Sequence, residues 1–133
     1  MLMADFFSAL TTGELEALSL KDLEYIPDEL GGAVRADKGK LRYELLPPGP
    51  IEDLVKVLSW GAEKYDDDNW KKGMSWKRCY ASAMRHLQAW FQGEDKDPES
   101  NLDHLAHVLC NVVFLQYYAD RHPDLDDRDR KES

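Results

Sequence analysis

One stretch, residues 73–118, constrains the fold most, because it has the pattern of two amphipathic helices joined by an acidic loop. Gly93 ends the first helix, and Pro98 prevents its continuation, since proline has no backbone N–H to donate. Ser100 or Asn101 is then placed to cap the second helix. Apolar side chains at helical spacing predict one buried face on the first helix: Cys79, Tyr80, Ala83, Met84, Leu87, Trp90 and Phe91.

The second helix carries a narrow polar stripe within a broad apolar surface. His104, His107 and Asn111 follow one another at i, i+3 and i+7, so they share one face. Buried imidazole and amide groups need hydrogen-bond partners, because an unpaired buried polar group is costly. Those partners are protein groups, a metal ion or a ligand. The apolar surface around the stripe consists of Leu102, Leu105, Ala106, Leu109, Val112, Val113 and Leu115.

A third helix is expected upstream, with Pro50 in its first turn. Its apolar face consists of Ile51, Leu54, Val55, Leu58, Ala62 and Tyr65. Long amphipathic helices without strand patterns predict an all-α helical bundle, with core helices at about 51–65, 76–92 and 101–119. The expected organisation is an N-terminal arm with short helices (1–36), a helical domain (37–122) and an acidic, largely disordered tail (123–133).

Composition limits the classes of partner. A net charge of −9 over 133 residues argues against a basic surface that binds nucleic acid. No apolar run reaches the roughly 20 residues of a membrane span, and the first residues lack signal-peptide features, so we expect a cytoplasmic protein. Cys79 and Cys110 lie on apolar helix faces, which predicts buried free thiols.

The acidic loop and the histidines suggest a metal site. Carboxylate oxygens suit Mg²⁺ or Mn²⁺, and added imidazoles shift the preference toward Mn²⁺ or Zn²⁺. The alternative is a solvated connection whose acids are favoured near the next helix N-terminus. Three histidines on two adjacent helices beside several acids favour the metal interpretation. The candidate residues are His86, Glu94, Asp97, Glu99, His104 and His107.

Two further segments contain candidate ligand contacts. Lys40 and Arg42 lie in a Gly- and Pro-rich loop, which is either a solvated loop or a phosphate-contacting one. Asn69 and Trp70 follow a run of aspartates and offer an amide for a base edge and an indole for stacking. Tryptophans in a small helical domain also serve the core, so both interpretations stay open for Trp70 and Trp76.

Four motifs occur in an order that resembles a known family. They are DKGKLRYELLPP, GAEKYDDDNWKKGMSW, RHLQAWFQGEDKDPES and HLAH, within residues 37–118. This order resembles the phage and bacterial dATP/dGTP pyrophosphohydrolases, relatives of the MazG-like all-α NTP pyrophosphatases that include phage MazZ enzymes. The resemblance implies a helical bundle that forms a homodimer or homotetramer with active sites near subunit interfaces. It also implies cleavage of a purine deoxynucleoside triphosphate, chiefly dGTP and also dATP, into the monophosphate and pyrophosphate.

For that reaction we expect two or more Mg²⁺ or Mn²⁺ ions, basic groups for the pyrophosphate and a stacking surface for the purine. Catalytic roles are expected for His86, Glu94 and Asp97. Metal ligands are expected among Glu63, Glu94, Asp97, Glu99, His104 and His107. Substrate contacts are expected from Lys40, Arg42, Lys64, Asn69, Trp70, Trp76, Arg85 and Asn111. In phages that replace adenine with 2-aminoadenine, such an enzyme supplies dGMP and drains dATP.

One departure from the MazG pattern affects the expected ligands. That pattern places E-x-x-E on one helix and E-x-x-D on the next. This chain has no E-x-x-E, and the E-x-x-D from Glu94 to Asp97 abuts Pro98. The His104–His107 pair lies where the second acidic motif is expected. Two alternatives of other classes remain: a non-catalytic nucleotide-sensing module, and a helical assembly protein whose acids and histidines satisfy one another.

Overall fold

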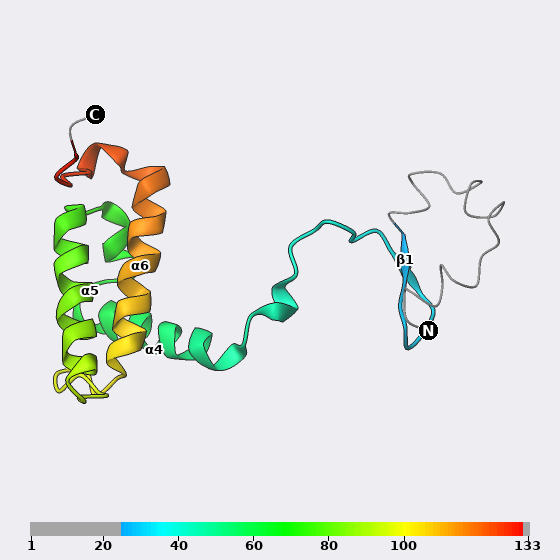
Figure 1. Ribbon diagram of the computed structural model, residues 1–133, viewed down its shortest axis with the longest axis horizontal. Helices are drawn as coiled ribbons and strands as arrows, with labels where there is room; N and C mark the ends of the chain where they lie inside the picture. Colours follow the sequence, from blue (N-terminus) through cyan, green and yellow to red (C-terminus); the bar gives the residue numbers. More distant parts are fainter. Residues whose placement is uncertain (1–24, 132–133) are drawn as a thin grey trace. The chain divides into compact units, whose positions relative to one another are not determined.

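The computed structural model describes residues 25–131, and the chain divides into two units, residues 1–45 and 46–133. In the first unit, strands β1 (Ile26–Pro27) and β2 (Val34–Arg35) form an antiparallel hairpin, in which Ile26 faces Arg35 (Figure 1). A 3₁₀ turn, η1 (Tyr43–Leu45), follows. Short helices were expected in the arm up to residue 36, but its described part is this hairpin. The short helix expected from Thr12 lies outside the described residues.

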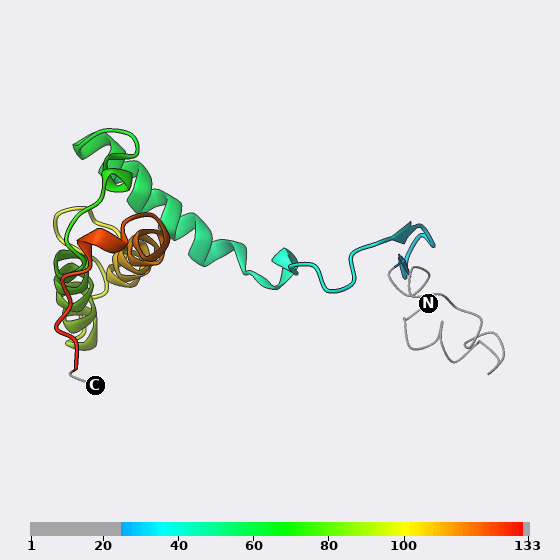
Figure 2. The same cartoon turned by 90° about the horizontal axis from the view of Figure 1, so that it is seen from above.

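The second unit is all-α, as predicted. Its described helices are α4 (Pro48–Lys64), α5 (Trp76–Phe91) and α6 (His104–Arg121), with short 3₁₀ helices η2 (Asn69–Lys72) and η3 (Pro123–Leu125). Helices α5 and α6 lie side by side and antiparallel, and α4 packs against α6 (Figures 1 and 2). No helix in the described part of the chain is long and apolar enough to cross a membrane.

The ends of the helices follow local signals in part. Helix α5 ends at Phe91, and Gly93 adopts a positive φ of 99° that favours glycine. The prediction that Ser100 or Asn101 caps α6 was wrong, because α6 begins at His104 with Asp103 at its N-cap position. The preceding loop keeps its own hydrogen bonds, including one from the Asp97 N–H to the Leu102 carbonyl (2.8 Å).

Two buried clusters form the core of the second unit. Val57, Ala106 and Cys110 join α4 to α6. Trp76, Cys79 and Tyr118 join α5 to α6, and the Tyr118 side chain is fully buried with its hydroxyl donating to the Trp70 carbonyl. Both thiols are free and buried, as predicted. Burial raises the pKa of Cys110 to about 12 and also raises the pKa of Cys79.

Part of the predicted apolar surface is not buried. Tyr80 and Phe91 are 61% and 79% exposed, because they lie on the side of α5 that no described element covers. On α6, Leu105 and Val112 are also exposed. The core therefore uses a narrower face of each helix than the apolar pattern suggests.

The prediction of a disordered tail was wrong for its described part. After α6, Leu125 packs against the cluster of Trp76, Cys79 and Tyr118. The Asp127 carboxylate accepts hydrogen bonds at the start of α5, from the Ser75 hydroxyl and from the Lys77 N–H. Charge and low hydropathy suggested disorder, but these contacts join residues 50 or more positions apart and cannot be seen in local composition.

We predict that Tyr118→Phe lowers the free energy of unfolding by about 1 kcal/mol, because the Trp70 carbonyl loses one hydrogen bond in a partly buried site. Urea denaturation followed by tryptophan fluorescence measures the change. Tyr80→Phe is the matched control, since Tyr80 is 61% exposed and should unfold like the parent protein. Equal stability of both variants would contradict the assigned role of this hydroxyl.

Candidate active site

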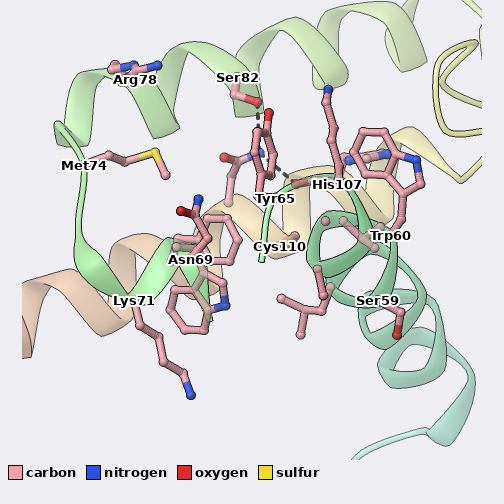
Figure 3. Close-up of a pocket in the computed structure, with 18 of the residues that line it drawn as sticks. Ser59, Trp60, Tyr65, Asn69, Lys71, Met74, Arg78, Ser82, His107 and Cys110 are labelled. Atoms are coloured by element: carbon pink, nitrogen blue, oxygen red, sulfur yellow. Dashed lines mark hydrogen bonds between the residues drawn. The ribbon is translucent and has the colours of Figure 1, made fainter. Parts of the chain in front are cut away.

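A pocket of about 1260 Å³ lies within the second unit, between α4, η2, α5 and α6. Figure 3 shows Trp60 and His107 toward one end of it, and Asn69, Lys71 and Met74 toward the other. Ten of the residues expected at the site line this pocket: Lys64, Asn69, Trp70, Arg85, His86, Asp97, Glu99, His104, His107 and Asn111. Glu63, Glu94 and Trp76 do not line it.

Two histidines face each other across α5 and α6. The Nδ1 atoms of His86 and His104 lie 2.8 Å apart. The ring of His86 also stacks on the ring of His107, with centroids 4.4 Å apart and planes nearly parallel at 5°. His104 and His107 are 3% and 6% exposed. The two histidines of the polar stripe predicted on α6 are therefore buried, whereas Asn111 is half-buried, and the two meet a third histidine on α5.

Glu94 fixes the orientation of His104. Its Oε1 lies 2.7 Å from His104 Nε2. An ionised carboxylate only accepts hydrogen bonds, so His104 donates its Nε2–H to Glu94. The lone pair at His104 Nδ1 is then available on the side that faces His86. Glu94 thus contacts His104 rather than the space between His86 and His104, and its expected role as a direct ligand stays a prediction.

Ser100 fixes both Asp97 and His107. Asp97 Oδ2 accepts from the Ser100 N–H (2.9 Å) and from its hydroxyl (2.8 Å). Because the hydroxyl proton goes to Asp97, the Ser100 oxygen accepts from His107 Nε2, at 2.7 Å. Burial opposes ionisation of Asp97, but the two hydrogen bonds from Ser100 outweigh it and hold the pKa of Asp97 below its usual range.

The environment keeps two of the histidines neutral. Burial lowers the pKa of His86, and the nearby imidazole of His107 lowers it further. Burial likewise lowers the pKa of His107, although Asp97 acts in the opposite direction. A neutral imidazole keeps a nitrogen lone pair that can bind a cation. These histidines are therefore suited to act as ligands near neutral pH.

The residues His86, Asp97 and His104 fit a metal ion. One ligand atom from each lies within 4.8 Å of the other two. Ligands about 2.1 Å from an ion stand roughly 3 Å apart at right angles, close to the observed Nδ1–Nδ1 distance of 2.8 Å. Metal-binding histidines also commonly donate their other N–H to a carboxylate, as His104 does to Glu94. Two imidazoles and one carboxylate suit Mn²⁺, Zn²⁺ or Fe²⁺ better than Mg²⁺.

Lys64 and Glu99 form an ion pair at the pocket, so two residues expected at the site are paired with each other. The hydrogen bond from Lys64 to Glu99 raises the pKa of Lys64 above its usual range. The Lys64 ammonium also lies 5.0 Å from the ring centroid of Trp60 and 5.4 Å from that of Tyr65. The sequence reasoning did not select Trp60, although its i, i+4 spacing to Lys64 places both on one face of α4.

The remaining expected residues have different settings. Trp76 lies in the core at 8% exposure, under the Arg128 guanidinium. Trp70 stacks on Phe114 with centroids 4.6 Å apart. The Asn111 side-chain amide donates to the Ser82 hydroxyl (3.2 Å) and to the His107 carbonyl (2.9 Å), so both of its N–H groups are used. Ser82 and Arg78 line the pocket without having been predicted.

Lys40 and Arg42 belong to the first unit, and their role at the site stays a prediction.

An all-α unit whose pocket gathers histidines, a carboxylate and basic side chains is suited to bind a divalent cation and an anionic ligand. Comparison with known proteins assigns the chain to a family. The chain belongs to the family described as "dATP/dGTP diphosphohydrolase, N-terminal", whose model matches residues 31–128.

A relative from Salmonella phage PMBT28, named "dATP/dGTP diphosphohydrolase", is 30% identical over 95 residues. The alignment covers 71% of this chain but only 32% of the relative, so the chain corresponds to about a third of that protein. No solved structure matches the chain.

We predict that Ser100→Ala lowers the free energy of unfolding by about 1–3 kcal/mol, because buried His107 loses the acceptor for its Nε2–H. Chemical denaturation measures the change. Ser59→Ala is the control, since the Ser59 hydroxyl is exposed and bonds only the Val55 carbonyl of its own helix. A Ser100→Ala protein as stable as the control would contradict the assigned hydrogen bond.

Proposed function

We propose that this chain is a metal-dependent deoxynucleoside triphosphate pyrophosphohydrolase, which cleaves dGTP chiefly and dATP also to the monophosphate and pyrophosphate. The observation that carries the proposal is the cluster of His86, Asp97 and His104 in a pocket that is also lined by basic side chains. Family membership supports the substrate class, because the matching relative is named for dATP and dGTP.

His86, Asp97 and His104 would hold one divalent cation, Mn²⁺ or Mg²⁺, of which Mn²⁺ fits these ligands better. When bound, the cation would supply positive charge for the phosphates and lower the pKa of a bound water. Glu94 keeps the Nδ1 lone pair of His104 directed toward His86 through its bond to Nε2. Ser100 holds the Asp97 carboxylate in place and favours its ionised form. Glu99, and Glu63 beyond the pocket, are the further acids proposed for a second ion.

The basic side chains of the pocket would bind the phosphates. Lys64 is held at the pocket by Glu99 and by two aromatic rings, and Arg85 lies one residue before His86. Guanidinium and ammonium groups stabilise charge that develops on the leaving pyrophosphate. The remaining basic residues of the lining are Lys71, Lys72 and Arg78.

The purine would bind through rings and amides. Trp60 and Tyr65 line the pocket beside Lys64, and Trp60 contacts the His107 ring edge-to-face, with centroids 5.7 Å apart. Asn69 and Asn111 supply amide groups at the pocket. Because both N–H groups of Asn111 are used within the protein, its carbonyl oxygen is the group left to accept a hydrogen bond from a base.

The finer parts of the proposal concern assembly and biological role. We propose a homodimer or homotetramer, supported by exposed apolar side chains on α5 and α6, among them Phe91, Leu105 and Val112. We also propose a role in phage nucleotide-pool remodelling for 2-aminoadenine DNA, supported by the products expected from the family. dGMP is the product that such a pathway needs.

The reaction is tested by incubating the protein with each dNTP and NTP in Mn²⁺ or Mg²⁺, with and without EDTA. We predict dGMP and dAMP with pyrophosphate, and loss of turnover with EDTA, because the phosphates need the bound cation. Chromatography of the products measures both. Diphosphate plus free phosphate would contradict the position of cleavage, and binding without turnover would point to the nucleotide-sensing alternative.

The metal assignment predicts that Glu94→Gln weakens Mn²⁺ binding by about 10–100-fold, because His104 loses a charged partner on its second nitrogen. Titration of the protein with Mn²⁺, followed by electron paramagnetic resonance, measures affinity without any turnover. Glu52→Gln, an exposed acid on α4 outside the pocket, is the charge-matched control. Equal Mn²⁺ affinity in the two variants would contradict the proposal that Glu94 supports metal binding through His104.

A further inference from the structure

The segment after α6 makes specific contacts with the turn that leads into α5. We refer to residues 122–130 as the C-terminal strap. His122 Nε2 lies 2.7 Å from the Lys71 carbonyl oxygen. A carbonyl only accepts, so the imidazole donates its Nε2–H to η2. The last turn of α6 adds the Tyr118 hydroxyl, which donates to the Trp70 carbonyl.

The strap also caps α5. The first N–H groups of a helix have no partner within it. Ser75 occupies the N-cap position but its side chain makes no capping hydrogen bond to the helix. Asp127 takes that role from a distant part of the chain: its Oδ1 accepts from the Lys77 N–H at 3.0 Å, and its Oδ2 accepts from the Ser75 hydroxyl.

The fit between strap and turn requires a glycine. Gly73 has a φ of 98°, which other residues rarely adopt. A Cβ at this position would lie 2.6 Å from Leu125 Cδ1 and 3.2 Å from the His122 ring. Arg128 then crosses Trp76, with its guanidinium 4.8 Å from the ring centroid, and it is held by Asp126 at 2.9 Å.

The contacted turn is one wall of the pocket, whereas the strap is not. His122, Leu125 and Asp127 are absent from the pocket lining. The wall that they hold contributes Asn69, Trp70, Lys71, Lys72, Gly73, Met74 and Arg78 to the lining. The strap therefore affects the pocket indirectly, through the lining residues whose backbone it holds in place.

We infer that His122 and Asp127 are positioning residues, which set the pocket wall at residues 69–78 for nucleotide binding. This inference rests on the proposed function for its effect on catalysis. The wall carries amide and basic groups at some distance in sequence from the histidine cluster, so its displacement weakens substrate binding more than the chemical step. The expected signature is a higher KM with kcat largely retained.

The test compares Asp127→Ala with Asp129→Ala. Asp129 is the matched control, because it lies in the same strap and pairs with Lys77 only through an exposed side chain. For Asp127→Ala we expect about a 3–10-fold increase in KM for dGTP, with kcat within about twofold of the parent, and faster amide hydrogen exchange at residues 69–78. Asp129→Ala should match the parent in all three measurements.

His122 provides a second, independent pair of variants. His122→Ala should raise KM and speed exchange at residues 69–78, while His122→Gln should restore both, because its amide N–H can donate to the Lys71 carbonyl. Circular dichroism and melting temperature establish that each variant is folded. Unchanged exchange at residues 69–78 in Asp127→Ala and His122→Ala would overturn the inference. Lower kcat with unchanged KM would overturn it as well, since that pattern indicates loss of active protein alone.

The exchange measurement separates this inference from the proposed function. A parent protein that hydrolyses no nucleotide would contradict the function, but exchange at residues 69–78 would still show whether the strap holds the wall. Conversely, the parent could hydrolyse dGTP while Asp127→Ala changes neither KM nor exchange. That result would confirm the proposed function and overturn the inference that the strap positions the pocket wall.

Discussion

The burial of two imidazoles on α6 is the constraint on which the rest of the second unit depends. His104 and His107 are almost fully removed from solvent, so each needs partners within the protein. The loop between α5 and α6 provides them, with Glu94 for His104 and Ser100 for His107. Ser100 in turn binds Asp97, so the loop is held by the same hydrogen bonds that satisfy the helix. The hydrogen bonds that hold the loop in the fold are thus the same ones that orient the residues of the candidate site.

The sequence predicted the elements that depend on local periodicity. Helical spacing of apolar residues predicted the all-α class, and Gly93 predicted the end of α5. The spacing of His104, His107 and Asn111 predicted that these polar groups share one face of α6 and need partners. The start of α6 could not be predicted in this way. A local capping signal at Ser100 was outweighed by its bonds to Asp97 and to His107, which lies seven residues further along the chain. The partners of the strap lie further still, so composition alone suggested disorder.

The candidate site shows the same limit. Glu94 and Asp97 were both expected as metal ligands, and the structure gives them different environments. Glu94 bonds an imidazole nitrogen that faces away from His86, whereas Asp97 lies with His86 and His104 in one cluster. A carboxylate that accepts from a histidine N–H makes that imidazole a better metal ligand. In the proposed metal site, imidazoles stand where the MazG-like pattern has an acidic motif, and Glu94 would supply negative charge through His104.

Charge at the pocket raises a further question, because a chain with a net charge of −9 repels a triphosphate at long range. Near the pocket the balance is different. The lining carries five basic side chains, Lys64, Lys71, Lys72, Arg78 and Arg85, and five carboxylates, Asp66, Asp67, Asp68, Asp97 and Glu99, so its formal charges cancel. Lys64 pairs with Glu99 and Lys71 pairs with Asp68, both through exposed side chains. Exposed ion pairs contribute little to stability, so under the proposed function a phosphate would replace Glu99 as the partner of Lys64 at little cost in free energy. The released carboxylate is then free to face a cation. Under the proposed function, the triphosphate would thus bind Lys64 and its metal ion would bind Glu99, so that substrate binding separates this ion pair.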